Sequence, residues 1–452
     1  MPFRTISETG EQYALLSFDK DGKERDNDPD GQAGLFSARL LNETKQHLPS
    51  DIFVFSHGWK GDITAAEDQY NRWIKAMLDL PVDRAAMGEK FKPLWIGLHW
   101  PSLPFGDEEL AADSFDATGG GLSPTAVVET YLERLGLGEE ARPLLETIVE
   151  ANRRNAAALS LPPEAATAYQ ELAVLAGRKA GGPFSPPDED GAPFDPDKAF
   201  DAGNAASIGT DFGGAGGFLG GILGPLRQLS YWTMKKRARS IGESGMHLFI
   251  AQLMNAAPVA KIHLMGHSFG CIVIASILGG PGAKEPLPRP VDSVALVQGA
   301  VSLWAFADTI PMAHGTGYFN PLFHHGAVRG PFLVTHSIHD RAVGILYPLA
   351  CAAAFAEPSF GDSDLPKYGG IGTFGVCGFG KVVKQPMLME TEPYHFQAGN
   401  IHNLESSKFI AKGGGVSGAH SDIDGPQVAH ALWQAAAASS KTGTATNTGG
   451  AA

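Results

Sequence analysis

The chain has 452 residues, 43% of them hydrophobic, and its 49 acidic against 35 basic side chains give a net charge of −14. Such a chain can bury a large core, in one domain or in several. The negative charge would repel a phosphate backbone, which disfavours nucleic acid as a partner. Cys271, Cys351 and Cys377 are too few for a disulfide scaffold, and we expect them as small buried side chains.

The N-terminal residues contain no basic region that leads into an apolar stretch, so we predict no secretory signal. This favours a cytoplasmic protein and leaves signal-independent export open. No window reaches the roughly 18 consecutive apolar residues that cross a bilayer. The nearest window, residues 212–226, is short and rich in glycine, so we expect no transmembrane helix.

Short apolar runs bounded by turn residues predict a mostly parallel sheet that helices cover on both faces, an α/β class. The clearest strand predictions are residues 52–56, 94–99, 261–265, 293–297 and 332–335. Three weaker strand predictions are residues 13–18, 36–41 and 407–411.

A long insertion separates the second and third of the clear strands. It carries helical patterns at residues 125–135, 139–158 and 164–176, a loop rich in proline and aspartate at 181–197, and a glycine-rich tract at 213–224. We therefore predict four segments along the chain. They are a first part of the core (1–104), a mostly helical cap or lid (105–244), a second part of the core (245–435) and a disordered tail (436–452).

Residues 266–270 read Gly-His-Ser-Phe-Gly and fit the G-x-S-x-G turn, in which a serine is exposed between a strand and a helix. With 56 glycines in the chain, the pentapeptide alone is weak evidence. Its context is stronger, because a buried-strand pattern precedes it and an apolar helix pattern follows it. We predict Ser268 as a nucleophile, against an inert serine in a glycine-rich loop.

A serine nucleophile needs a base and an orienting acid, and on this scaffold they follow it in the order acid, then histidine. Asp340 follows the strand predicted at 332–335, and His420 lies in a loop just before a helix pattern, so we predict them as acid and base. The competing acids are Asp292, which precedes its strand, and Asp308. The competing bases are His395, His402 and His430.

The developing oxyanion requires positioned N–H donors. One is expected from the backbone of Phe269, directly after the nucleophile. For the second we predict Trp59, because the strand at 52–56 runs into a His-Gly-Trp-Lys-Gly turn with glycines on both sides. The alternative is an ordinary turn with Trp59 packed in the core.

Through Ser-His-Gly-Trp at 56–59, Gly-His-Ser-Phe-Gly at 266–270, Asp340 and His420, the sequence resembles the α/β-hydrolase superfamily. It looks most like bacterial lipase- or esterase-like hydrolases with a Trp-Pro-Ser strand end, here residues 100–102. The resemblance covers residues 50–104 and 245–435. It implies a Ser-His-Asp triad that cleaves carboxylic esters through an acyl-enzyme, with no cofactor and no metal. The expected partner is an ester-containing small molecule or lipid.

Two readings remain as alternatives. The same site could serve an acyl thioesterase or a serine peptidase, and a relative without catalytic activity could use the capped cleft to bind a ligand or a protein.

Two further patterns are weighed against ordinary explanations. Residues 26–31 copy the first half of a calcium loop, but position 12 is Ser37 instead of glutamate, which favours a solvated acidic turn. Residues 225–239 predict a core helix whose charged outer face carries Lys235, Lys236, Arg237 and Arg239. The sharper hypothesis is a lid that makes peripheral contact with an anionic membrane through these cations.

Overall fold

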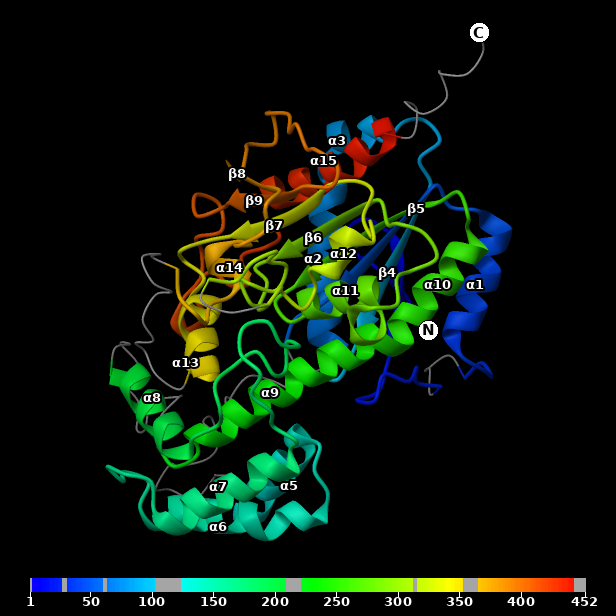
Figure 1. The fold of residues 1–452 in the computed structure, drawn as a ribbon. Coiled ribbons are helices and arrows are strands. Elements are labelled where there is room, and N and C mark those ends of the chain that lie inside the picture. Colours follow the sequence, from blue (N-terminus) through cyan, green and yellow to red (C-terminus); the bar gives the residue numbers. More distant parts are fainter. Residues whose placement is uncertain are drawn as a thin grey trace.

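The computed structural model describes residues 2–26, 31–59, 63–102, 123–208, 221–311, 315–352 and 365–442. Within these ranges the chain forms a nine-stranded sheet with the order β1-β2-β4-β3-β5-β6-β7-β9-β8 (Figure 1). All neighbouring strands are parallel except β1 and β2. The strands are β1 (Phe3–Thr5), β2 (Gln12–Ser17), β3 (Asp51–Ser56), β4 (Pro93–His99), β5 (Lys261–His267), β6 (Ser293–Val297), β7 (Phe332–His336), β8 (Val382–Pro386) and β9 (Ile401–Glu405).

The five clear strand predictions are confirmed as β3 to β7, and the weaker one at 13–18 is β2. Two predictions are wrong. Residues 36–41 begin helix α1 (Phe36–His47), whose buried Phe36, Leu40 and Thr44 lie four residues apart, which is helical spacing that a six-residue window does not separate from a strand. Residues 407–411 follow the last strand, β9, instead of forming one.

Helices cover both faces of the sheet, which confirms the α/β class. Alternate residues of β3 point to opposite sides, as strand geometry requires. Ile52 and Val54 pack in a core shared with α1, α10 (His247–Ala256) and α11 (Gly270–Gly279). Phe53 and Phe55 pack in a second core shared with α2 (Ile63–Leu78) and α15 (Pro426–Thr442).

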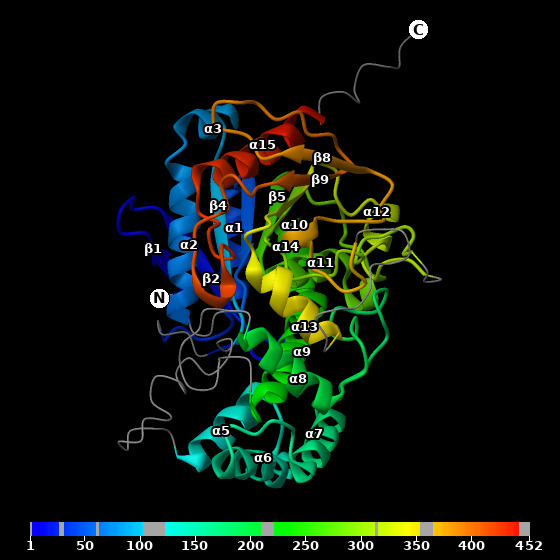
Figure 2. The same cartoon turned by 90° about the vertical axis from the view of Figure 1, so that its left-hand side faces the viewer.

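A group of helices between β4 and β5 forms its own hydrophobic core below the sheet in Figures 1 and 2. These helices are α5 (Pro124–Leu135), α6 (Arg142–Arg154), α7 (Pro163–Leu175) and α8 (Pro196–Ile208). The helical patterns at 125–135, 139–158 and 164–176 are thus confirmed within one or a few residues of their bounds, whereas α8 was not predicted. A 3₁₀ turn, Glu139–Ala141, precedes α6.

Helix α9 (Gly224–Ile241) connects this group to the sheet (Figure 1). Its first half contributes Leu226 and Leu229 to the core of the helical group, while Met234 and Ala238 belong to the core against the sheet. One continuous helix is therefore shared by both packing units, and it ends three residues before the predicted boundary at residue 244.

Helix α9 is a core helix, and its cations do not form the charged outer face that the lid hypothesis needs. Lys235 is fully buried and Arg237 is 7% exposed. Lys235 Nζ donates to Asp190 Oδ1 at 2.7 Å, and Arg239 Nε donates to Asp188 Oδ1 at 2.6 Å. Of the four cations only Lys236 is exposed, so the hypothesis of membrane contact loses most of its residues.

The first residues of the predicted disordered tail are helical, because α15 continues to Thr442 and buries Ala436. Residues 443–452 lie outside the described residues. The remaining helices are α3 (Pro81–Ala86), α12 (Pro321–His324), α13 (Tyr347–Ala352) and α14 (Ile371–Phe374). In the described part of the chain no helix is both long and apolar enough to cross a bilayer. The three cysteines are buried and unbridged, as predicted.

Candidate active site

Ser268 lies between β5 and α11 in a strained turn. Its φ is 56°, a left-handed conformation that few residues other than glycine adopt. The turn is held on both sides, because the Ser268 N–H donates to Val297 O at 3.2 Å and the Ala300 N–H donates to Ser268 O at 3.2 Å. The predicted sequence of strand, sharp turn and helix is therefore present.

Gly270 shows why this turn needs a glycine after the serine. A Cβ atom at Gly270 would lie 2.3 Å from Ser56 O and 2.7 Å from His57 O. The start of α11 thus packs directly against the end of β3. This approach places the nucleophile turn beside the loop that follows β3.

Asp340 and His420 form a direct pair at the same edge of the sheet. His420 Nδ1 lies 2.8 Å from Asp340 Oδ2, and the two side chains are buried, with Asp340 1% exposed. The loop that carries His420 is tied to the turn that carries Asp340, since the Ala419 N–H donates to His339 O at 2.9 Å. The structure brings the predicted acid and base together although 80 residues separate them.

Gln298 is a further partner of this acid that the sequence analysis missed. Its Nε2 donates to Asp340 Oδ2 at 2.9 Å and to Gly372 O at 3.0 Å, while the Val343 N–H donates to Asp340 Oδ1 at 2.9 Å. Gln298 directly follows β6 and has a φ of 47°. A polar residue at the carboxyl end of a predicted strand was the available signal.

His267, the neighbour of the nucleophile, contacts the base. Its Nε2 lies 2.9 Å from His420 O, and the two imidazole centroids are 4.8 Å apart. In the described part of the chain Ser268 Oγ makes no hydrogen bond, so the bond from Ser268 to His420 is not formed in this state. Catalytic hydrogen bonds are often long until substrate binds.

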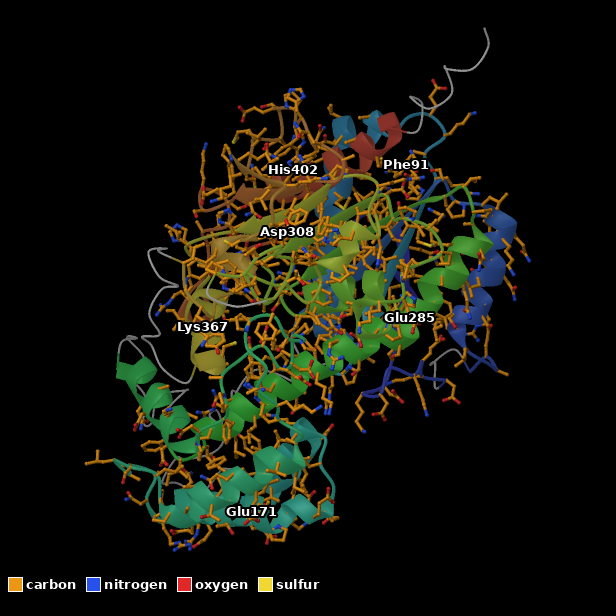
Figure 3. The ribbon with its side chains drawn as sticks, viewed as in Figure 1. Phe91, Glu171, Glu285, Asp308, Lys367 and His402 are labelled. Carbon is orange, nitrogen blue, oxygen red and sulfur yellow. The ribbon has the colours of Figure 1, made fainter. Side chains whose placement is uncertain are left out.

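The competing candidates lie apart from this pair in other contacts, and Figure 3 labels two of them, Asp308 and His402. Asp308 accepts hydrogen bonds from Asn320 and Gly380, and Asp292 binds the Arg329 guanidinium. His402 bonds to Gln397 and His430 to Asp83, while His395 is exposed. Cys271, next to the turn, is no rival nucleophile, since burial raises the pKa of its thiol well above the ordinary value.

The loop after β3 lies against the nucleophile. A Cβ atom on Gly58 would be 2.5 Å from Ser268 Cβ and 3.2 Å from Ser268 Oγ, so only glycine allows this approach. The Trp59 ring stacks on the Phe269 ring with 5.5 Å between centroids. Phe269 precedes the first residue of α11, where backbone N–H groups have no acceptor within the helix. Gly58, which directly precedes Trp59, therefore lies against Ser268, and Phe269 directly follows it.

Tyr231 of α9 joins these two aromatic residues from the side of the helical group. Its ring centroid lies 5.2 Å from that of Phe269 and 6.2 Å from that of Trp59. Burial raises the pKa of Tyr231 well above the ordinary value, so the hydroxyl remains neutral. The region between β4 and β5 thus contributes a side chain that packs against the rings of both residues predicted as amide donors.

Among the residues that the structure describes, no group of three or more His, Cys, Asp or Glu side chains is arranged to hold a metal ion. The calcium-like pattern at 26–31 falls largely on residues 27–30, which lie outside the described residues. Comparison of the chain with protein-family models, with curated proteins and with solved structures finds no match.

Proposed function

We propose that the protein is a serine hydrolase that cleaves carboxylic esters, with an α/β-hydrolase architecture in which the helical group between β4 and β5 serves as a cap. The observation that carries the proposal is the strained Ser268 turn, which lies against Gly58 and whose neighbour His267 contacts His420 of the Asp340–His420 pair. A left-handed serine is costly to maintain, and such strain is typical of functional sites.

In the proposed reaction His420 Nε2 takes the Ser268 hydroxyl proton as Oγ attacks the ester carbonyl carbon. Asp340 holds the proton on His420 Nδ1, which keeps Nε2 as the base. The Trp59 and Phe269 amides bind the oxyanion. His420 then protonates the departing alcohol, and water hydrolyses the acyl-enzyme with His420 again acting as base.

The proposal makes the region between β4 and β5 a determinant of the acyl group, through Tyr231 of α9, whose ring packs against the rings of Trp59 and Phe269. A series of p-nitrophenyl esters of increasing acyl length tests this, because a contact that selects the acyl chain makes kcat/KM depend on its length. The Tyr231→Ala variant should shift the preferred length. An unchanged length profile in Tyr231→Ala contradicts the role of the cap.

The activity itself is tested with a fluorophosphonate probe and p-nitrophenyl butyrate. Wild-type protein should be labelled at Ser268 and should hydrolyse the ester, and Ser268→Ala should lose both. Ser293→Ala removes another buried serine hydroxyl and should keep both. Hydrolysis that persists in Ser268→Ala, or folded wild-type protein that reacts with neither reagent, overturns the proposal.

A further inference from the structure

The peptide unit between Gly58 and Trp59 is held from one side by two side chains. Gly58 O lies 2.7 Å from His57 Nδ1 and accepts a hydrogen bond from Ser102 Oγ at 3.1 Å. Ser102 is fully buried and His57 is 1% exposed. Ser102 is the serine of the Trp-Pro-Ser strand end, to which the proposed reaction assigns no role.

The contacts of His57 fix its tautomer. The Trp100 N–H donates to His57 Nε2 at 3.3 Å, and since a backbone N–H can only donate, Nε2 carries no proton. The proton of the neutral imidazole is therefore on Nδ1, from which it is donated to Gly58 O. The His57 ring is clamped by the Trp100 ring, stacked at 5.5 Å with an interplanar angle of 9°.

The backbone of His57 is fixed as well. Its N–H donates to the Tyr70 hydroxyl at 2.8 Å, and its carbonyl oxygen accepts from Trp100 Nε1 at 3.1 Å. Burial raises the pKa of Tyr70 well above the ordinary value, so the hydroxyl keeps its proton and donates it to Leu98 O. His57, in the loop after β3, is thus hydrogen-bonded both to Tyr70 of α2 and to Trp100, which follows β4. Tyr70 is in turn hydrogen-bonded to Leu98 of β4, so these contacts form one network.

The direction of the Trp59 N–H follows from the direction of the Gly58 carbonyl. No peptide bond in the described residues is cis, so the C=O and N–H of this unit point to opposite sides of the chain. The carbonyl points to His57 and Ser102, and Gly58 itself lies against Ser268. Hydrogen bonds to the carbonyl therefore set the angle at which the amide is presented to the nucleophile.

We infer that His57 and Ser102 are positioning residues, which orient the Gly58–Trp59 peptide so that the Trp59 amide donates to the oxyanion. This inference rests on the proposed function. The two side chains contact the Gly58 carbonyl, and we propose that they act through this peptide. Loss of their hydrogen bonds should weaken transition-state binding and leave binding of the ester almost unchanged.

The test uses purified full-length protein and compares Ser102→Ala with Ser102→Thr, and His57→Gln with His57→Asn. Threonine keeps the hydroxyl, and the asparagine amide occupies the place of Nδ1, whereas the glutamine amide lies one bond further out. For each variant kcat and KM are measured with p-nitrophenyl butyrate. The Ki of an alkyl trifluoromethyl ketone is measured too, because the ketone forms a tetrahedral adduct with the serine.

We expect Ser102→Ala and His57→Gln to lower kcat on the order of tenfold or more, with KM within about twofold, since loss of an oxyanion donor itself costs about 10²–10³ in kcat. The Ki of the ketone should rise by the factor by which kcat/KM falls. Threonine and asparagine should restore most of both. Ser293→Ala should leave all three parameters as in the wild type.

The inference is overturned if Ser102→Ala keeps the wild-type kcat, if threonine is as damaging as alanine, or if kcat falls while the Ki of the ketone does not change. Should Ser102→Ala fail to fold, the two His57 variants carry the same comparison. Failure of the proposed function has a different signature, because wild-type protein then shows no hydrolysis that depends on Ser268, and the inference falls with it.

Discussion

Two sets of serine, histidine and aspartate stand out in the described part of the chain, one at the carboxyl ends and one at the amino ends of the parallel strands. At the carboxyl ends lie Ser268 and the pair formed by His420 and Asp340. At the amino ends, Ser293 Oγ lies 2.8 Å from His263 Nδ1, and His263 Nε2 lies 3.2 Å from Asp51 Oδ1. Judged by residue types and contacts alone, the second set is the more complete.

Backbone conformation and surroundings separate the two sets. Ser293 is the first residue of β6 and pairs in register with His263 on β5, so both sit in regular strands. Ser268 has a φ of 56° and is flanked by Gly58 and by the start of α11. The trio at the amino ends has no such turn and joins three strands inside the core. A serine, a histidine and an aspartate in contact are therefore not enough to indicate a catalytic site. A strained backbone at the serine and nearby backbone amides are needed as well.

The largest difference that we predict between the two sets is in catalytic activity. His420→Ala should lower kcat by about 10³ to 10⁴, and because Asp340 keeps its hydrogen bonds from Gln298 and the Val343 N–H, it should lower the free energy of unfolding by less than His263→Ala does. His263→Ala should do the reverse, with wild-type kcat and a loss of about 3 kcal/mol, because Asp51 is left as a buried unpaired carboxylate. Ester hydrolysis and urea unfolding measure the two. Loss of activity in folded His263→Ala would contradict the distinction.

A smaller loss is expected at the acid. Asp340→Asn keeps the shape of the side chain but offers His420 an amide that favours the wrong tautomer, so kcat should fall on the order of 10³-fold. Asp51→Asn is the matched change in the other set and should keep kcat. Steady-state kinetics of both variants give the comparison, and equal losses would show that the two sets are not functionally distinct.

Gln298 provides a finer test of the difference between the two sets, because it contacts Asp340 and, in the proposed reaction, none of the reacting atoms. Gln298→Ala should lower kcat about tenfold through a looser carboxylate, as positioning losses of this kind do. Gln434→Ala is the matched control, since Gln434 Nε2 donates at 2.9 Å to Asp83, the partner of His430. It should leave kcat unchanged. Equal kinetics for the two variants would remove Gln298 from the site.

The smallest expected effect is on the pH dependence of stability. Burial tends to raise the pKa of Asp51, but hydrogen bonds from His263 and Ser50 outweigh it and hold the pKa below the ordinary value. Asp51 therefore contributes stability that is present above about pH 4, the unfolded value, and is lost as pH falls through the folded pKa. Urea midpoints from pH 6 to pH 3 should show a flatter dependence for Asp51→Asn. An unchanged curve would mean that the pair adds no stability.

Two histidines lead to a second prediction on the pH dependence of stability, in a higher pH range. Burial lowers the pKa of His336 and of His402, so their protonation favours the unfolded chain. Their contribution to stability is complete above about pH 6.5 and is lost as pH falls through the folded values. His402→Gln should reduce the loss of stability between pH 6.5 and pH 5, measured by thermal unfolding at each pH. A steeper loss in the variant would contradict this sign.

Sequence by itself determined the central strands and the chain order of the site. Apolar runs such as 293–297 are local signals, and the positions of Asp340 after a strand and of His420 in a loop before a helix predicted a pair that the structure brings together. Edge strands such as β8 were missed because they are half exposed and carry no apolar run, and 36–41 was wrong because six residues do not reveal helical period. Neither error affects the residues that were predicted for the site.

Only the tertiary structure decided which polar residues meet. Lys235 reads as a surface cation, yet it is buried because Asp190, 45 residues away, pairs with it. Gln298 and Ser102 gain their proposed roles from partners in the loops that follow other strands, Asp340 after β7 and Gly58 after β3. Local sequence encodes burial and period through the hydrophobic pattern, whereas hydrogen bonds between distant polar groups depend on the folded geometry that places their atoms within about 3 Å.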